Sequence, residues 1–563
     1  MLTQLFGILF MVITLLLLAK PLGKYMARVY AGEPSFLDLM SPVEKRIFLI
    51  CGIHPAREMD WKTHLKAFLA INLIWFLLGM GVLMTQGSLL LNPDHNPSMS
   101  PDLAFNTAVS FISNTNLQHY SGETGVSYLS QLVLVFFQFV SAAAGMAACV
   151  VVFHAMREGT LTKLGNFYKY LLLSITRILL PLAVFLAIIL AFNGVPMTFK
   201  GKLPLVTLQG DTQQVSRGPV AAMIAIKQLG TNGGGFYGAN SAHPLENPNY
   251  LTNMLECISI LLIPVALVFA LGYYLKNKAL SRMIFGVMLI GFILLAIPAI
   301  YYEMNANPAL KPAGISQQEG NMEGKEMRFG SGASALWGVM TTVTSNGSVN
   351  AMHDSFLPLS GMTEMMGMEV NCFFGGVGVG LMNFYIFMII AVFISGLMVG
   401  RTPELLGKKI EAREMKIASI IALLHTLLIL AGTALAAYLV YHKHLSSWLT
   451  NPGYHGFSEM LYEFSSASAN NGSEFGGLNA NTPFWNIADG LVMLLSRFLP
   501  IIGPVAIAGL LASKKQVPES AGTLKTGTLT FGLMVFAVIV IIAALSFFPA
   551  LCLGPVAEHF TLF

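Results

Sequence analysis

Long apolar runs dominate this sequence and restrict what it can fold into. We identify ten such runs of about 20 residues, the length at which an α-helix crosses the hydrocarbon core of a bilayer. Only 11% of the 563 residues are charged, under half the share typical of soluble domains. The sequence therefore predicts an all-α integral membrane protein with ten transmembrane helices. They are predicted at roughly 2–18, 67–86, 127–156, 171–193, 252–275, 283–302, 376–400, 417–441, 485–512 and 526–549.

Basic residues are distributed unevenly between the connections of these helices. Most of the 32 Lys and Arg residues lie in alternate connections, which are 19–66, 157–170, 276–282, 401–416 and 513–525. The positive-inside rule places these segments in the cytoplasm and both termini on the outer side. The basic segment 401–416 is also a candidate contact for a cytoplasmic partner or for anionic lipid.

Four short polar loops recur along the chain at nearly regular intervals. They read SNTNLQH at 113–119, GTNGGGF at 230–236, TSNGSVN at 344–350 and ANNGSEF at 469–475. We align them on one asparagine, spaced by 116, 114 and 125 residues, which is Asn116, Asn232, Asn346 or Asn471. Such near-regular recurrence indicates a repeat architecture.

A short, partly apolar stretch precedes each loop and is expected to form a re-entrant half-helix. These stretches are 102–112, 218–229, 333–343 and 457–468. Each repeat is predicted as helix, half-helix, loop and helix, and the repeats run parallel because all four loops fall on the outer side. The four units are predicted at 65–156, 171–275, 283–400 and 417–512, with an extra helix and its cytoplasmic connection at 1–64 and another extra helix at 526–563.

Four such loops predict one central pore. Non-helical backbone is costly at membrane depth unless it lines a water-filled cavity. Glycine lets the backbone turn its carbonyl oxygens inward, and rings of carbonyls can replace the hydration shell of a monovalent cation. Half-helices that end at the ion each add roughly −0.5 elementary charge. Because only Glu474 and Glu123 lie near the loops, and divalent ions usually need carboxylates, K⁺ is favoured over Ca²⁺ or Mg²⁺.

The alternative interpretation of these loops is a set of simple turns. Asn-Gly is a common turn signal, so a single loop of this kind would indicate a turn, whereas four in register favour a filter. The first loop departs most, since Leu117 and Gln118 stand where the others have glycine and a small residue. The predicted ring is therefore asymmetric, and Gln118 is a candidate side-chain ligand.

With these loops and ten helices, the whole chain resembles the superfamily of Trk, Ktr and HKT potassium transporters, and more narrowly the KdpA family. The resemblance implies a non-catalytic subunit that binds K⁺ from the outer side and passes it to a P-type ATPase subunit like KdpB. It also implies small partners like KdpC and KdpF, and a place in the bacterial inner membrane. By loop position, it implies the K⁺-selecting residues Asn114, Thr115, Asn116, Gln118, Thr231, Asn232, Gly233, Ser345, Asn346, Gly347, Asn470, Asn471 and Gly472.

Two further features lie outside the loops. Arg497 is inside the ninth predicted span, where a charge is costly and usually faces a cavity or a partner. It matches an arginine under the filter of KdpA-like proteins, so we expect it to limit leakage; a structural ion pair is the alternative. The glycines of GGVGVG (Gly375, Gly376 and Gly378 among them) either allow close helix packing or form a broken helix, as gate or tunnel mouth, beneath the third loop.

Two other functions remain open. A self-sufficient K⁺ channel or symporter of the Trk or Ktr type would share the four-unit plan. An enzyme with its own ATPase chemistry is disfavoured, because no GxxxxGK[ST] nucleotide loop occurs and the stretch 524–530, which is similar to a P-type phosphorylation motif, begins with Leu524 instead of aspartate. No catalytic residue is therefore predicted, and a net charge of +4 gives no nucleic-acid footprint.

Overall fold

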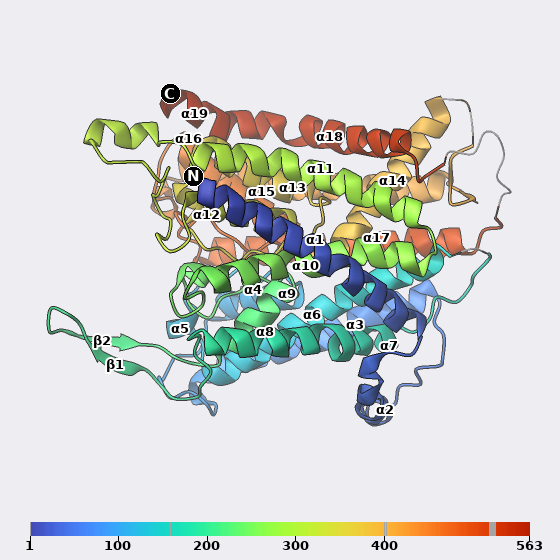
Figure 1. Ribbon diagram of the computed structural model, residues 1–563, viewed down its shortest axis with the longest axis horizontal. Helices are drawn as coiled ribbons and strands as arrows, with labels where there is room; N and C mark the ends of the chain where they lie inside the picture. The colour runs from blue at the N-terminus through green and yellow to red at the C-terminus, as the bar shows by residue number, and fades with distance from the viewer. Residues whose placement is uncertain (1, 158, 399, 401, 517–524, 563) are drawn as a thin grey trace.

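The computed structural model describes residues 2–157, 159–398, 400, 402–516 and 525–562. Arg401 of the basic segment and Leu524 of the phosphorylation-like stretch lie outside this described part. Long helices lie side by side, with the strand pair β1–β2 (Leu203–Val206 and Thr212–Val215) at one end of the bundle and helix α2 (Ser41–Ile50) at the other (Figure 1).

Ten helices of the described part are long and apolar enough to cross a membrane, as the sequence predicts. They are α1 (Leu2–Ala31), α3 (Trp61–Thr85), α6 (Tyr128–Ala155), α7 with α8 (Phe167–Ser174 and Leu180–Phe192), α10 (Tyr250–Tyr274), α11 (Lys278–Glu303), α14 (Val379–Met398), α15 (Ala412–His442), α17 (Pro483–Ala512) and α18 (Leu529–Leu551). The shorter elements are α5 (Gly122–Gly125), α19 (Ala557–Leu562), β3 (Glu404–Leu405) and β4 (Lys408–Lys409).

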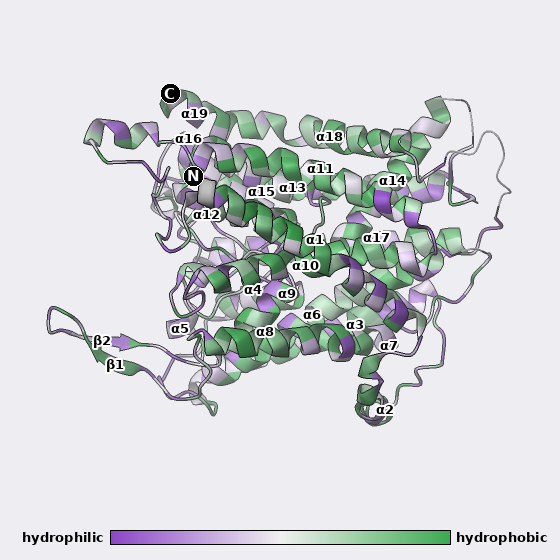
Figure 2. Cartoon of the chain, viewed as in Figure 1, coloured by the Kyte–Doolittle hydropathy of each residue, from purple (hydrophilic) through white to green (hydrophobic). Residues whose placement is uncertain are grey.

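Burial separates the central helices from the peripheral ones. The most apolar windows of α6 and α10 are 89% and 83% buried, while those of α1 and α15 are only 17% and 22% buried. Hydrophobic residues run along the lengths of the helices, and hydrophilic residues gather at the two ends and inside the bundle (Figure 2). The start of α1 and the helix α19 lie at the same end as β1–β2, in line with the prediction that both termini share one side (Figure 1).

Four short helices form the centre of the molecule at the predicted half-helix positions. They are α4 (Pro101–Ile112), α9 (Val220–Leu229), α12 (Ser331–Val343) and α16 (Tyr454–Ala469). All residues of α12 are buried, all of α9 except Ala222, and most of those of α4 and α16. Each is too short to cross a bilayer and ends at one of the four polar loops.

The seventh span matches its prediction, but a helix that the sequence did not predict precedes it. The sequence places its start at the GGVGVG stretch, but a buried helix α13 (Pro358–Val370) precedes that stretch. The helix starts at the outer end of α11, where the Leu357 N–H donates to Glu303, and ends beside the third loop, where Ser345 donates to Asn371. The glycines Gly375, Gly376 and Gly378 therefore lie in a break between α13 and α14, directly before the span.

Candidate functional site

The loops that follow the four half-helices touch one another in a closed ring. Three contacts are so close that a Cβ added to the loop glycine would lie 1.9, 2.1 and 2.0 Å from a carbonyl oxygen of the next loop: Gly233 against Asn346, Gly347 against Asn471, and Gly472 against Thr115. The fourth contact joins the first loop to the second, where Asn114 Nδ2 donates to the Thr231 carbonyl over 2.8 Å. The predicted convergence on one axis is confirmed.

The backbone corrects the alignment of the first loop by one residue. In every loop, one backbone N–H donates to the carbonyl oxygen five residues earlier, at a distance of 2.9 Å. The donors are the N–H groups of Thr115, Asn232, Asn346 and Asn471. Thr115, and not Asn116, is therefore the equivalent of the three asparagines. Asn116 takes the place of the loop glycines.

Backbone torsion angles support the corrected alignment. Each loop has two positive φ angles, two residues apart, at Asn114 and Asn116, Thr231 and Gly233, Ser345 and Gly347, and Asn470 and Gly472. The second position is glycine in three loops and Asn116, with φ 55°, in the first. Both amide atoms of the buried Asn116 side chain lack a hydrogen-bond partner among the described residues.

The asparagine side chains join neighbouring units to each other. Asn346 Nδ2 donates to Lys227 O at 3.0 Å, and Asn471 Nδ2 donates to Thr341 O at 2.7 Å, so the third and fourth loops are each held to the half-helix of the preceding unit. Asn470 Nδ2 donates to Thr115 Oγ1 over 3.0 Å and closes the ring between the fourth and first loops. The side chains thus fix the ring from behind and leave the backbone to form its inner edge.

Four carbonyl groups of the ring have no hydrogen-bond donor. They belong to Thr115, Asn232, Asn346 and Asn471, all fully buried, and within the described residues no N–H or O–H group donates to them. Buried carbonyls in native structures nearly always have a partner. Equivalent unpartnered oxygens from four units are the arrangement that a dehydrated monovalent cation needs.

Gln118 lies beside this ring and holds two loops together. Its Oε1 accepts from Gly235 N over 2.8 Å, and its Nε2 donates to Gly235 O over 3.2 Å and to Tyr120 Oη over 3.0 Å. The structure therefore assigns Gln118 a bracing role between the first and second loops. Leu117, which is fully buried, belongs to an apolar cluster that also contains Phe464.

The break before the seventh span and Arg497 lie together under the ring. Val377 N donates to Thr231 Oγ1 over 3.0 Å, so the break touches the second loop from below. A Cβ on Gly145 of α6 would lie 2.6 Å from Val377 O and 3.1 Å from Arg497 Nη2. Arg497, only 3% exposed, donates to Ser141 O over 3.2 Å, and no ion pair of it is found within the described residues.

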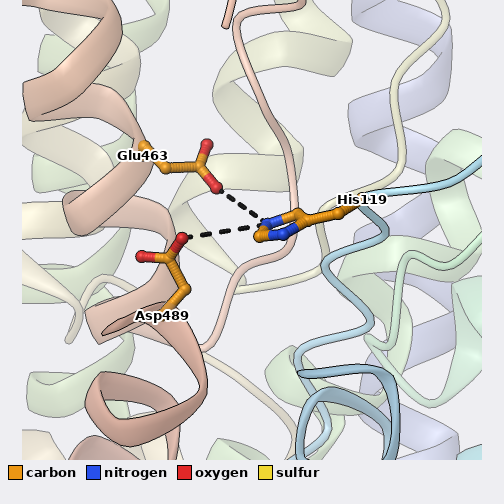
Figure 3. Close-up of side chains that lie close together, drawn as sticks. All are labelled: His119, Glu463 and Asp489. Carbon is orange, nitrogen blue, oxygen red and sulfur yellow. Dashed lines mark hydrogen bonds and ion pairs between the residues drawn. The ribbon is translucent and has the colours of Figure 1, made fainter. Parts of the chain in front are cut away.

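Three ionisable side chains next to the ring were not anticipated from the sequence. His119, Glu463 and Asp489 come from the first loop, α16 and α17 and point toward one another (Figure 3). His119 lies 344 residues before Glu463 in the sequence, so the spacing of the residues gave no signal that His119 joins the two carboxylates.

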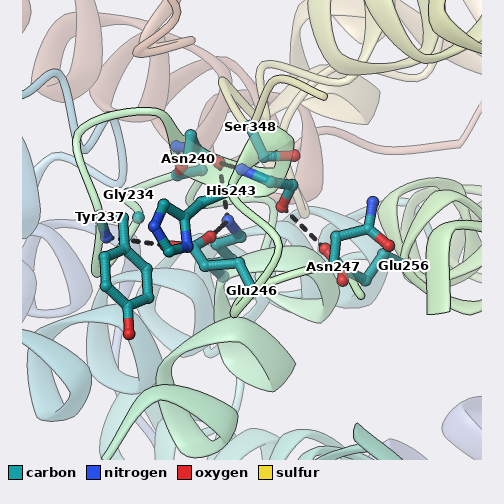
Figure 4. Close-up of polar contacts among 12 residues, drawn as sticks. Gly234, Tyr237, Asn240, His243, Glu246, Asn247, Glu256 and Ser348 are labelled. Carbon is teal, nitrogen blue, oxygen red and sulfur yellow. Dashed lines mark hydrogen bonds and ion pairs between the residues drawn. The ribbon is translucent and has the colours of Figure 1, made fainter. Parts of the chain in front are cut away.

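A second unanticipated cluster supports the second loop from behind (Figure 4). Lys227 of α9 is fully buried and donates to Glu246 over 2.5 Å and to Asn240 over 2.7 Å. Asn240 in turn donates to Gly233 O over 2.8 Å, and Glu246 accepts from Tyr237 N over 2.9 Å. A lysine at the end of a predicted half-helix, followed by a glutamate in the next loop, was the available signal.

A ten-helix bundle with four half-helices and a ring of four loops places the chain in the class of membrane proteins built from pore-loop units. The crystal structure of the potassium transporter TrkH from Vibrio parahaemolyticus has this fold, with a TM-score of 0.51 at 14% identity over 89% of this chain and 96% of that one. The family model for KdpA, described as potassium-transporting ATPase A subunit, matches residues 9–560, so the chain belongs to the KdpA family.

Curated relatives cover the full length of the chain. A protein of Flavobacterium psychrophilum is 62% identical and one of Alicyclobacillus acidocaldarius 50% identical, each over 100% of both sequences. Both are named potassium-transporting ATPase potassium-binding subunit. The resemblance of the loops to this family is confirmed.

Proposed function

We propose that this chain is the potassium-selecting subunit of an ATP-driven uptake pump, and that K⁺ enters the ring of four loops from the outer side. The observation that carries the proposal is the set of buried, unpartnered carbonyl oxygens at Thr115, Asn232, Asn346 and Asn471. A bare K⁺ supplies the positive charge that such oxygens lack. Family membership and the names of the curated relatives support potassium as the ion.

The proposed filter consists mainly of backbone. Its residues are Asn114, Thr115, Asn116, Thr231, Asn232, Gly233, Ser345, Asn346, Gly347, Asn470, Asn471 and Gly472, with Gln118 as a brace. None of them is a carboxylate, which disfavours divalent cations. The half-helices end at these loops, and their C-terminal ends add negative potential where the ion would lie.

The route beyond the filter is proposed to begin beside the break between α13 and α14. A cavity of about 50 Å³ lies there, lined by residues of α13 to α18 that include Glu369, Asn371 and His425. Both carboxylate oxygens of the buried Glu369 lack a partner among the described residues. We propose that K⁺ leaves through this region toward a P-type ATPase subunit like KdpB, accompanied by subunits like KdpC and KdpF. The complex would lie in the bacterial inner membrane, with both termini of this chain outside.

Reconstitution distinguishes the pump from the alternative, a self-sufficient channel or symporter. The structural likeness to the transporter TrkH is the reason to test that alternative. The chain is purified from native membranes with its accompanying subunits and then again alone, and both are placed in liposomes. We expect ATP-driven ⁸⁶Rb⁺ or K⁺ uptake from the complex and almost no flux from the chain alone. Fast K⁺-selective flux from the chain alone would identify a channel and overturn the pump proposal.

The same liposomes test Arg497. A unit charge within about 8 Å of an ion, at an effective dielectric constant near 20, contributes about 2 kcal/mol to its barrier. Arg497→Met in the isolated chain should therefore raise passive K⁺ flux by more than about tenfold, without changing which ion binds. Arg282→Met, at the basic end of α11, is the control. An altered preference between K⁺ and Na⁺ in Arg497→Met would contradict the assigned role.

A further inference from the structure

Beside the contact between the first and fourth loops, three side chains form a compact ligand set. His119 Nε2 lies 3.3 Å from Glu463 Oε1 and 3.8 Å from Asp489 Oδ2 (Figure 3). All three side chains are at most 1% exposed. The atoms that face each other lie within 4.8 Å, so one small ion between them can reach all three.

The hydrogen bond at Nδ1 of His119 determines whether Nε2 carries a proton. Asn486 Nδ2 donates to Asp102 over 2.8 Å and to Asn481 over 3.2 Å, so the amide oxygen of Asn486 is the atom that faces His119. That oxygen lies 2.7 Å from Nδ1, which must therefore carry the proton. In the neutral ring, the lone pair of Nε2 then points at two carboxylates.

Asp489 adds a second, independent observation. It is fully buried, and neither of its carboxylate oxygens has a hydrogen-bond partner among the described residues. The imidazole at 3.8 Å is beyond hydrogen-bonding distance. A proton held between Glu463 and His119 Nε2, which are 3.3 Å apart, would leave both oxygens of Asp489 without a partner, whereas a cation between the three side chains gives each side chain a contact.

We propose that His119, Glu463 and Asp489 bind one divalent transition-metal ion, with Zn²⁺ as the best match. Ligand atoms on a tetrahedral zinc at about 2.1 Å are about 3.4 Å apart, close to the separations found here. Two carboxylates neutralise the ion, and the imidazole nitrogen favours zinc over Ca²⁺ or Mg²⁺, which take oxygen ligands. The Asn486 oxygen on Nδ1 is the outer-shell partner typical of a metal-bound histidine.

Such an ion would link the end of the first loop to α16 and α17. The same two units also meet through the hydrogen bond from Asn470 Nδ2 to Thr115 Oγ1 at 3.0 Å. The metal would fix the position of His119, three residues after Asn116, and so stiffen the least regular part of the ring.

The test uses the full chain, purified with its accompanying subunits and depleted of metal with EDTA. Zn²⁺ is titrated by calorimetry, and bound zinc is counted by mass spectrometry after desalting. We expect one site per chain in the wild type, and an affinity loss of more than about tenfold in Asp489→Asn and in Glu463→Gln, since even outer-shell changes cost this much. X-ray absorption of the zinc-loaded wild type should show one imidazole and oxygen ligands.

The control is His455→Gln, which disrupts the other group of a histidine and two carboxylates, Asp354, His455 and Glu459. It should bind zinc as the wild type does. The proposal is overturned if the wild type binds no more zinc than the Asp489→Asn, Glu463→Gln double variant, or if only His455→Gln loses the ion. An all-sulfur or multi-histidine X-ray absorption spectrum would likewise exclude this site.

Discussion

Asn116 holds a backbone conformation that glycine provides in the other three loops. Asparagine is among the non-glycine residues that adopt positive φ most readily, which suits it to the φ of 55° at this position. Unlike the glycines, Asn116 carries a side chain into the ring, and both polar atoms of its amide are unpartnered within the described residues. The asymmetry of the ring therefore comes from Asn116 more directly than from Leu117.

The loop glycines give the first prediction at this scale. A methyl group on Gly347 would lie 2.1 Å from Asn471 O, and any side chain on Gly233 would lie 1.9 Å from Asn346 O, at φ angles of 89° and 85°. Gly347→Ala and Gly233→Ser should therefore displace the carbonyl ring. We expect the K⁺ concentration for half-maximal ATP hydrolysis to rise about tenfold, equivalent to ~1.4 kcal/mol, with weaker exclusion of other cations.

Gly453→Ala is the matched control for these variants. Gly453 also has a positive φ, 80°, but an added Cβ meets no atom within 4 Å. It should leave K⁺ affinity unchanged. Wild-type affinity and discrimination in both Gly347→Ala and Gly233→Ser would mean that the ring is not the filter.

The sequence predicted which loops meet but not the register of the first one. The sequence alignment pairs Asn116 with the other asparagines because their side chains are the same. The backbones of the four loops instead share two positive φ angles, and no single residue type occupies those positions. For this reason the sequence does not reveal that Thr115 is the equivalent of the asparagines in the other loops. The cluster of His119, Glu463 and Asp489 was missed because its members come from two distant units.

At the scale of elements, the half-helices and most spans match their predictions to within a few residues, apart from extended ends such as that of α1. Long apolar segments and polar loops leave few alternatives for them. The sequence did not predict helix α13 because it is only 13 residues long and contains Glu364 and Glu369, and two glutamates are not expected in a buried helix. Both carboxylates are buried inside the bundle, a position that hydropathy does not predict.

The start of α16 is tied to the C-terminal helix α19 through a charged histidine. His455 lies 2.8 Å from Asp354 and 2.7 Å from Glu558. Burial alone would lower the pKa of His455, but hydrogen bonds to these two carboxylates raise it to about 10. The ion pair therefore stabilises the fold fully below pH 6.5, the ordinary histidine pKa, and its contribution is lost as the pH rises through about 10.

His455→Gln should release α19. We expect amide hydrogen exchange across α19 to be about fivefold faster than in the wild type at pH 8, for a partly exposed pair worth ~1 kcal/mol. The difference should disappear above pH 10, where the wild type loses the same proton. His442→Gln, which changes an exposed histidine at the end of α15, should exchange like the wild type. Equal exchange in His455→Gln and wild type at pH 8 would show that α19 does not depend on this pair.

At the scale of the whole molecule, the ring joins all four units, so an ion bound in it should stabilise the entire fold. A ligand present at 100 times its dissociation constant adds about 2.7 kcal/mol to the free energy of unfolding. We expect K⁺ to raise the Tm of the purified protein by a few degrees relative to the same concentration of Na⁺, measured by tryptophan fluorescence.

Gly347→Ala serves as the comparison for this measurement, because its weakened ring should show a smaller K⁺-dependent rise. A Tm that is identical in K⁺ and Na⁺ for the wild type, across the range in which transport saturates, would contradict an ion site shared by the four units.

The contact between Asn470 and Thr115 spans 355 positions of the chain. During synthesis, the first loop can meet the second loop early, but its contact with the fourth loop can form only after the last unit has been inserted. Chains that stop after the third unit would lack the contacts of Asn470 and Gly472 with Thr115, and we expect cells to degrade them faster than the full-length chain.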